Sequence, residues 1–226
     1  MTLLRATARH DIVAFPKHRE REAHGRVRDR PPCYTRTMPL PALLPTALKE
    51  WATVCHALET GRQMLLLRKG GIYEAAGEFE VENRQFLLFP TYLHQNLKML
   101  KPEAHAGFEP HGAEPRHVRL SSAAEVTDVI QLRSRGQMDA LDAEHVWTAP
   151  LIDMRFNYRP ENPLYLLLVR AYRLRQPVTV ENTPAYAGCK SWVPLDRPVE
   201  TADALPALDD ERYGVRRDLI LQSLGA

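Results

Sequence analysis

The sequence predicts an α+β protein with a mainly antiparallel or curled mixed sheet flanked by helices. Three observations predict this class: apolar segments of strand length come in hairpin-like pairs, they do not alternate regularly with helices, and longer segments show a helical apolar period. At 226 residues with 44% hydrophobic content, the chain is long enough for one large domain plus a tail. We expect one globular domain over residues 38–226, preceded by a tail over residues 1–37.

Two long helices are expected near the ends of this domain. The first runs over Thr46–Thr60, with Thr46 as its cap and Gly61 at its end. Its inward stripe consists of Leu48, Trp51, Ala52, Cys55 and Leu58. The last runs over residues 210–224 and is capped by Asp209. Its apolar anchors are Tyr213, Leu219, Ile220 and Leu224.

The segments between these helices predict the sheet. Met64–Leu67 and Phe86–Phe89 are apolar on both faces, as buried strands are, whereas residues 78–82 alternate glutamate with apolar residues. Pro90 is expected to end a strand, and Thr91 to cap a helix that continues to Lys101 and precedes a loop over residues 102–117. The other predicted elements are strands at Val118–Leu120, Val126–Leu132 and Val178–Val180, a short helix over Met138–His145, and a hairpin of Leu151–Tyr158 with Leu164–Leu174.

The tail differs in charge from the rest of the chain. Residues 1–37 contain nine Lys or Arg and four Asp or Glu, a net formal charge of +5, which leaves −3 for residues 38–226. The basic pI therefore comes from the tail and is weak support for nucleic-acid binding by the domain. Two interpretations of the tail stay open: a disordered basic arm, or a mis-assigned start with Met38 as the initiator.

The cysteines and the apolar runs favour a cytoplasmic protein. Cys33, Cys55 and Cys189 are far apart and odd in number, so they form no disulfide framework or zinc spacing. The N-terminus lacks the continuous apolar segment of a secretory signal, and runs such as Leu164–Val169 are too short to span a bilayer. We expect no membrane partner.

Two polar blocks, residues 68–74 and 89–95, are the most informative part of the sequence. The first block offers cationic side chains for a phosphate or carboxylate, and glycines that let backbone approach it closely. The second block is expected to open a helix, whose N-terminus favours anions. The candidate ligand-binding residues are Arg68, Lys69, Gly70, Gly71, Thr91, His94 and Gln95, with Lys190 and Trp192 on the rim.

These blocks support three functional hypotheses. The leading one is a binding module for a phosphate-bearing or other anionic ligand, either a small molecule or nucleic acid. The rival is a hydrolase or nuclease-like enzyme in which His94 and Glu74 act as acid and base. The third is a structural protein-interaction domain, marked by a large exposed apolar patch. The ordinary interpretation, a capped helix beside a glycine hairpin and a solvated basic pair, also stays open, and the sequence indicates no cofactor.

Several other features are interpreted as structural. Glu74, Glu78, Glu80 and Glu82 resemble a metal-binding set, but a solvated strand face explains them better, so no metal site is predicted. Glu74 is the exception, because it lies within the first block and is expected to be an acid–base group or an ion-pair partner for Arg68. Residues 188–191 resemble the end of a phosphate loop, but residue 183 is Thr where that loop needs glycine.

Four further side chains carry structural expectations. Cys189 is expected to be a buried structural cysteine, with a thiolate stabilised by Lys190 as the alternative. Tyr186 is expected to pack in the core or at the rim, or to stack on a base or sugar. A buried arginine needs a partner, so Arg155 is placed at a sheet edge and Arg170 is left open.

The order of these motifs resembles a bacterial family known as domain of unknown function 1802. The resemblance covers residues 44–195 and implies a compact single domain, with no reaction to transfer. The matching residues are Leu48–Trp51, Leu67–Ile72, Glu74, Phe89–Thr91, His94, Gln95, Arg155, Phe156, Tyr158, Pro160, Pro163–Tyr165 and residues 188–192.

Overall fold

The computed structural model describes residues 39–69, 74–75, 78–79, 83–188 and 190–225, with the backbone alone for residues 74–75 and 78–79. One seven-stranded sheet has the order β2-β7-β6-β5-β1-β8, with β9 paired to β7; β3 and β4 pair separately. Strands β1 and β5 are parallel and the other neighbours are antiparallel, which confirms the predicted class. The strands are β1 Leu43–Trp51, β2 Leu65–Lys69, β3 Glu74–Ala75, β4 Glu78–Phe79, β5 Gln85–Thr91, β6 His117–Leu132, β7 Leu164–Glu181, β8 Trp192–Glu200 and β9 Leu205–Pro206. The α-helices are α1 Ala52–Glu59, α2 Arg135–Asp139, α3 Ala149–Asn157 and α4 Asp210–Leu224.

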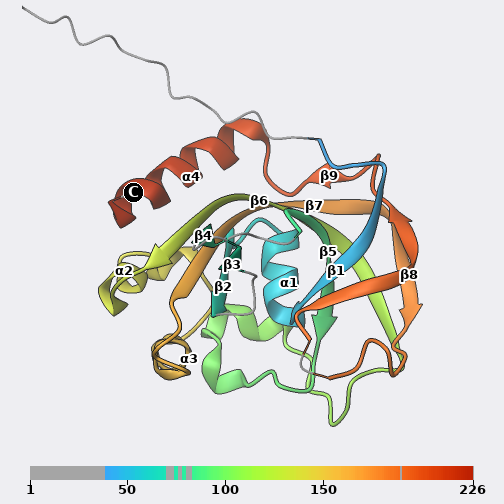
Figure 1. Ribbon diagram of the computed structural model, residues 1–226, viewed down its shortest axis with the longest axis horizontal. Helices are drawn as coiled ribbons and strands as arrows, with labels where there is room; N and C mark the ends of the chain where they lie inside the picture. The colour runs from blue at the N-terminus through green and yellow to red at the C-terminus, as the bar shows by residue number, and fades with distance from the viewer. Residues whose placement is uncertain (1–38, 70–73, 76–77, 80–82, 189, 226) are drawn as a thin grey trace, which may run out of the picture. The chain divides into compact units, whose positions relative to one another are not determined.

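The sheet is curled but not closed. Its two longest strands, β6 and β7, arch over α1 (Figure 1). Their pairing shifts register between Leu120 and Ser122 and again between Val126 and Asp128. Such bulges bend a strand and increase its twist, so they explain how one sheet wraps around a helix.

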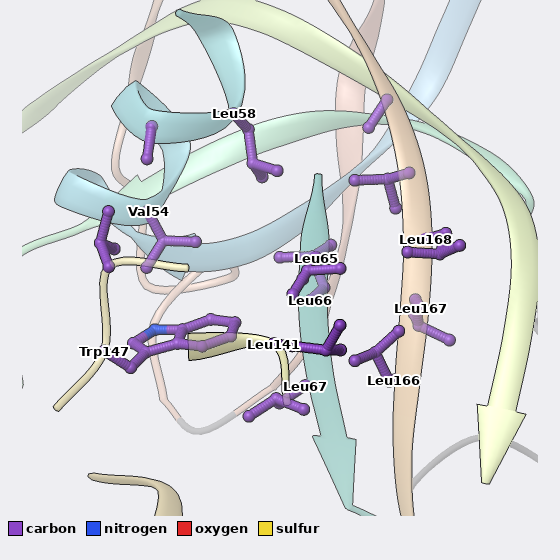
Figure 2. Packing of buried hydrophobic residues seen from close by; sticks show 14 of the residues in the cluster. Val54, Leu58, Leu65, Leu66, Leu67, Leu141, Trp147, Leu166, Leu167 and Leu168 are labelled. Atoms are coloured by element: carbon purple, nitrogen blue, oxygen red, sulfur yellow. The ribbon is translucent and has the colours of Figure 1, made fainter. Parts of the chain in front are cut away.

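The main hydrophobic core lies between α1 and the strands β2 and β7. Figure 2 shows Val54 and Leu58 of α1 beside Leu65–Leu67 and Leu166–Leu168, with Trp147 and Leu141 closing the cluster. The leucines at 65–67 and 166–168 are at most 2% exposed, whichever face of the sheet they occupy. The leucines of β2 and of the first half of β7 are therefore covered on two sides, which matches the continuous apolar sequence there.

A second core cluster fills the opposite face of the other half of the sheet. It includes Ala47 of β1, Leu87 and Phe89 of β5, and Val193 of β8. Adjacent residues Ala47 and Leu48 belong to different clusters, as expected when successive side chains of a strand point to opposite faces. Strand β1 is thus buried on both faces.

Helix α4 is fixed to the rest of the fold by polar contacts. Asp209 caps it as predicted, since its side chain accepts from the Arg212 N–H. Arg217 donates to both carboxylate oxygens of Asp128 at 2.7 and 2.5 Å, and the Tyr213 hydroxyl lies 2.6 Å from that of Thr127. Of the predicted apolar anchors, Tyr213, Ile220 and Leu224 are buried, whereas Leu219 is exposed.

The predicted helix over Thr46–Thr60 is wrong in its first half. Residues 43–51 form β1, and only residues 52–59 are helical. Strand β1 pairs with β5 on one side and β8 on the other, and this pairing outweighs the local helical pattern. Thr46 is consequently a strand residue, while Gly61, with φ of 71°, does follow the helix end.

The helix predicted from Thr91 to Lys101 does not form. Strand β5 continues through Pro90 to Thr91, because these residues pair with Glu50 and Trp51 of β1. Strand β6 pairs with β5 only as far as Leu87, so the missing N–H of Pro90 interrupts no hydrogen bond between β5 and β6. Only a 3₁₀ turn at Leu97–Met99 follows, capped by Asn96, and a second covers Pro102–Gly107.

Other boundaries also differ from the prediction. Leu151–Tyr158 is not a strand, because Ala149–Asn157 forms α3. The strands predicted at 118–120 and 126–132 are one strand, β6, and Val178–Val180 is the end of β7. The helix predicted over Met138–His145 is divided into α2 and a 3₁₀ turn at Asp142–Glu144. Among the described helices, none has the length and apolar character needed to cross a membrane.

Candidate anion-binding cleft

A cleft of about 850 Å³ opens where the parallel strands β1 and β5 end. The ends of these strands contribute Lys49–Trp51, Phe89 and Thr91, and α3 contributes Arg155. The loop between β7 and β8 and the segment before β6 form other walls. The remaining described lining residues are Arg68, Leu93, His94, Gly112–Arg116, Asn182–Pro184, Ala187, Gly188, Lys190 and Ser191.

An ion pair between Arg68 and Glu50 forms part of this cleft. Arg68 Nη2 lies 3.0 Å from Glu50 Oε2 and 3.3 Å from the Lys49 carbonyl, and the two side chains are 12% and 6% exposed. Arg68 belongs to β2 and Glu50 to β1, which are separated by three strands in the sheet order. The pair therefore joins the two sides of the curled sheet.

Arg155 lies beside this pair and has no carboxylate partner among the described residues. Burial lowers the pKa of its guanidinium; nearby Glu50 opposes this effect and the positive charge of Arg68 adds to it. Its Nε–H group is buried and has no acceptor in the described part of the chain, and the same holds for the Nε–H of Arg68. A buried donor without an acceptor is costly, so these two groups would gain from a bound anion.

The other cleft charges are engaged with the protein to different degrees. Lys49 Nζ donates to the carbonyls of Tyr186 and Gly188, and so fixes the loop that precedes β8. The Glu114 carboxylate accepts from the N–H groups of Tyr92 and Leu93 at 3.0–3.1 Å. Arg116 makes a long, exposed ion pair of 3.6 Å with Glu181.

The cleft is cationic as a whole. Its described lining contains five Lys or Arg residues and two glutamates, a formal excess of three positive charges. Both glutamates are already hydrogen-bonded, Glu50 to Arg68 and to its neighbour's N–H, and Glu114 to backbone. Lys49 and Arg116 already contact other groups of the protein, so the charge that an anionic ligand would meet comes mainly from Arg155 and Lys190.

The structure brings Arg68, Thr91, His94 and Lys190 of the predicted site together in this cleft. Thr91 Oγ1 donates to the Glu50 carbonyl at 3.1 Å, which joins the ends of β1 and β5. His94 and Lys190 are exposed at the cleft. Because no helix begins at Thr91, the anion preference expected from a helix N-terminus is absent, and Glu114 occupies the free N–H groups of this turn.

Three predicted site residues have other positions. Lys69 Nζ donates to the carbonyls of Arg155 and Phe156 at the end of α3. Gln95 accepts from the N–H and hydroxyl of Thr53, in the first turn of α1, at 2.9 and 2.8 Å. Trp192 packs edge-on against Phe86, with ring centroids 5.2 Å apart.

Some predicted residues lie outside the described part of the chain, and two others, Arg170 and Tyr186, are buried and bonded within the protein. Gly70, Gly71, Cys189 and the Glu74 side chain fall outside them, so the acid–base pair of His94 and Glu74 stays a prediction. Arg170 is buried, pairs with Asp210 and lies over the rings of Tyr172 and Tyr213. Tyr186 is buried, and its hydroxyl accepts from the Asp196 N–H.

The sequence interpretation missed Lys49, Glu50, Glu114 and Arg116, and it gave Arg155 the wrong environment. Lys49 and Glu50 were assigned to a helix, where a charged pair reads as solvent-exposed. In a strand buried on both faces, the same two charges would have indicated a site, because buried charges need partners.

No metal site is evident in the described residues. No group of three or more His, Cys, Asp or Glu side chains converges there as a metal site would require. Exposed large apolar side chains include Val215 and Leu219, one turn apart on α4, so the interaction-domain hypothesis stays a prediction.

Comparisons with known proteins give a family but no activity. The family described as "Domain of unknown function (DUF1802)" matches residues 47–218. No curated protein matches the chain. Solved structures of ASCH from Zymomonas mobilis and of two mutant proteins of it have 11–12% identity and TM-scores of 0.36–0.38, over 76–80% of this chain and 93–99% of theirs. At these TM-scores the similarities establish neither a shared fold nor a shared function.

Proposed function

Because the chain belongs to the DUF1802 family, whose function is unknown, we propose a function from the cleft itself: the protein binds a phosphate-bearing anionic ligand between Arg68 and Arg155. The observation that carries this proposal is the pair of buried Nε–H groups on these two arginines. Guanidinium groups bind phosphate through several N–H donors at once, and Arg68 and Arg155 each keep a buried donor without an acceptor among the described residues.

The charge of the cleft supports the same ligand. Glu50 forms an ion pair with Arg68, and Arg155 beside them has no carboxylate of its own among the described residues. Lys190 adds an exposed positive charge at the cleft, and the half-buried Lys49 lines the same cleft. A phosphate group would offset this positive charge and satisfy the free donors together.

The size of the cleft favours a ligand larger than phosphate alone. Small-molecule sites have volumes of roughly 300–1,000 Å³, and this cleft, at about 850 Å³, lies within that range. Leu93, His94 and Trp51 supply apolar and aromatic lining next to the cations. A nucleotide-sized phosphate compound or a short stretch of single-stranded nucleic acid satisfies these conditions, and both share the phosphate chemistry.

Calorimetric titration with three probes tests the proposal. The probes all carry phosphate but differ in size: inorganic phosphate, adenosine 5′-monophosphate and a ten-nucleotide single-stranded RNA. We expect at least one to bind, and Arg155→Gln to weaken that binding on the order of tenfold or more, the usual size for a charge-assisted contact. The matched control is Arg133→Gln, which removes an exposed arginine outside the cleft lining.

The pattern of binding distinguishes the ligand sources. Tighter binding of the RNA than of the mononucleotide, with a steep salt dependence, would assign nucleic acid, whereas equal binding would assign a small phosphate compound. Failure of all three probes to bind, or equal effects of Arg155→Gln and Arg133→Gln, would refute the proposal.

A further inference from the structure

We infer that Lys69 is a positioning residue, which fixes Arg155 for anion binding without touching the ligand. The inference rests on the proposed function. It assigns a different role to a lysine whose position next to Arg68 suggests direct ligand contact. The structure favours the indirect role because the ammonium group of Lys69 is directed at the backbone of α3.

The contacts of Lys69 are specific to the end of that helix. Its Nζ donates to the Phe156 carbonyl at 2.6 Å and to the Arg155 carbonyl at 3.1 Å. These carbonyls belong to the last turn of α3, where backbone acceptors have no partner within the helix. A cation there also interacts favourably with the negative end of the helix dipole. Lys69 therefore bonds the backbone of the residue whose side chain lines the cleft.

Both arginines of the proposed site are consequently set by the end of β2. Consecutive residues of a strand point to opposite faces, so Arg68 is directed to Glu50 of β1 and Lys69 to α3. Arg68 reaches the cleft directly, and Arg155 is fixed there through Lys69. Strand β2 is in turn held in the core by Leu65–Leu67, which makes it a rigid base for this arrangement.

A double-mutant cycle on phosphate binding tests this role. The variants are Lys69→Met, Arg155→Gln and their combination, titrated with inorganic phosphate. We expect Lys69→Met to weaken binding about five- to tenfold, and to cause no further loss when Arg155→Gln is already present, because residues that act as a unit are not additive. Lys69→Arg, which keeps a donor for the same carbonyls, is expected to restore most of the affinity.

Two controls separate positioning from charge and from folding. Lys98→Met removes an exposed lysine outside the cleft lining and should leave affinity unchanged. At 0.5 M salt the field of a distant charge is screened, whereas displacement of Arg155 persists, so the Lys69→Met effect should remain. Urea unfolding of each variant ensures that affinity is compared between folded proteins.

The outcomes distinguish this inference from the proposed function. Suppose that the wild-type protein binds phosphate and Arg155→Gln does not. If Lys69→Met then binds normally, or if its loss of phosphate affinity adds fully to that of Arg155→Gln, the positioning role is refuted and the proposed function stands. If Lys69→Met loses stability with no change in affinity, Lys69 is only a structural cap. If wild-type protein binds none of the three phosphate probes, both proposals fail.

Discussion

Glu50 and Arg68 show how much a single pair of residues can determine in this molecule. Both oxygens of the Glu50 carboxylate are used, one by Arg68 and one by the Trp51 N–H at 2.8 Å. Removing one member of a buried pair leaves an uncompensated charge, which usually costs about 3–5 kcal/mol. The pair therefore supports the fold and the cleft at once, and neither partner could be exchanged without affecting both.

Only one member of this pair could be identified from the sequence. Arg68 follows an apolar strand beside two glycines, which marks the end of a packed element. Glu50 lies 18 positions earlier in a segment with a helical pattern, and no local signal indicates that the sheet curls to bring it to Arg68. The prediction offered Glu74 as one partner for Arg68, because a sequence gives proximity along the chain more readily than proximity in space.

His145 provides a pH-dependent prediction at the residue scale. It is 1% exposed, its Nδ1 accepts from the Trp147 N–H, and its ring lies 5.3 Å from the Trp147 indole. Burial, assisted by Lys101, lowers its pKa from 6.5 to about 4. Between these values the unfolded chain binds a proton and the native protein does not, so stability falls as the pH decreases through this window.

Because of His145, we expect the free energy of unfolding to decrease by about 2 kcal/mol between pH 7.5 and 5. Urea unfolding at a series of pH values measures the slope, and His145→Gln should remove that part of it. His117→Gln, at an exposed position, serves as the control and should leave the slope as it is. A slope that His145→Gln does not alter would contradict the prediction.

At the scale of elements, the start of α1 depends on a residue that is distant in sequence. The helix begins at Ala52 directly after β1, and its N-cap residue Trp51 provides no side-chain acceptor. Gln95 takes that role, accepting from the Thr53 N–H and hydroxyl. This cap explains why Gln95 belongs to a polar block that looks like a binding site in the sequence.

Replacing Gln95 with Ala should therefore affect stability and not binding. Loss of a helix cap costs about 1 kcal/mol, and Gln95 is not among the described residues that line the cleft. Urea unfolding measures the first effect and phosphate titration the second. Gln222→Ala, on an exposed part of α4, should change stability by less than about 0.5 kcal/mol. A drop in phosphate affinity for Gln95→Ala alone would return Gln95 to the ligand site.

The elements that the sequence predicted well are those whose own residues determine them. Leu65–Leu67 is apolar on both faces, and Asp209 caps the helix that follows it, so β2 and α4 were recognised. β1 was misread because a strand buried on both faces, followed at once by a helix, has a pattern that a single helix also explains. α3 was misread as a strand because residues 152–158 alternate apolar with polar side chains, which is the period of a strand.

For the molecule as a whole, the curl of the sheet determines where the cleft lies. Three strands lie between β2 and β1 in the sheet, yet Arg68 of one pairs with Glu50 of the other. The bend depends on register shifts near Ser121 and Thr127, and on pairing between segments distant in sequence. Such long-range pairing leaves little signal in the local sequence. Some residues of the cleft could therefore be predicted one by one, but the set of residues that meet there could not.

The distribution of charge over the whole chain leads to a last prediction. Residues 1–37 carry a net charge of +5 and residues 38–226 a net charge of −3, yet the described lining of the cleft has a formal excess of three positive charges. Specific phosphate binding should therefore depend on the cleft, and any general attraction to polyanions should depend on the tail. A protein beginning at Met38 separates the two.

We expect this shortened protein to keep its phosphate affinity and to change in stability by less than about 0.5 kcal/mol, because all described residues of both core clusters lie beyond Met38. Its binding to single-stranded RNA at low salt should be weaker than that of the full chain, and the difference should vanish at 0.5 M salt, since exposed charges are screened there. Titration of both proteins with phosphate and with RNA at two salt concentrations measures this. A loss of phosphate affinity on shortening would mean that the tail takes part in the site. An unchanged RNA affinity at low salt would mean that the cleft alone attracts the polyanion, against the net negative charge of residues 38–226.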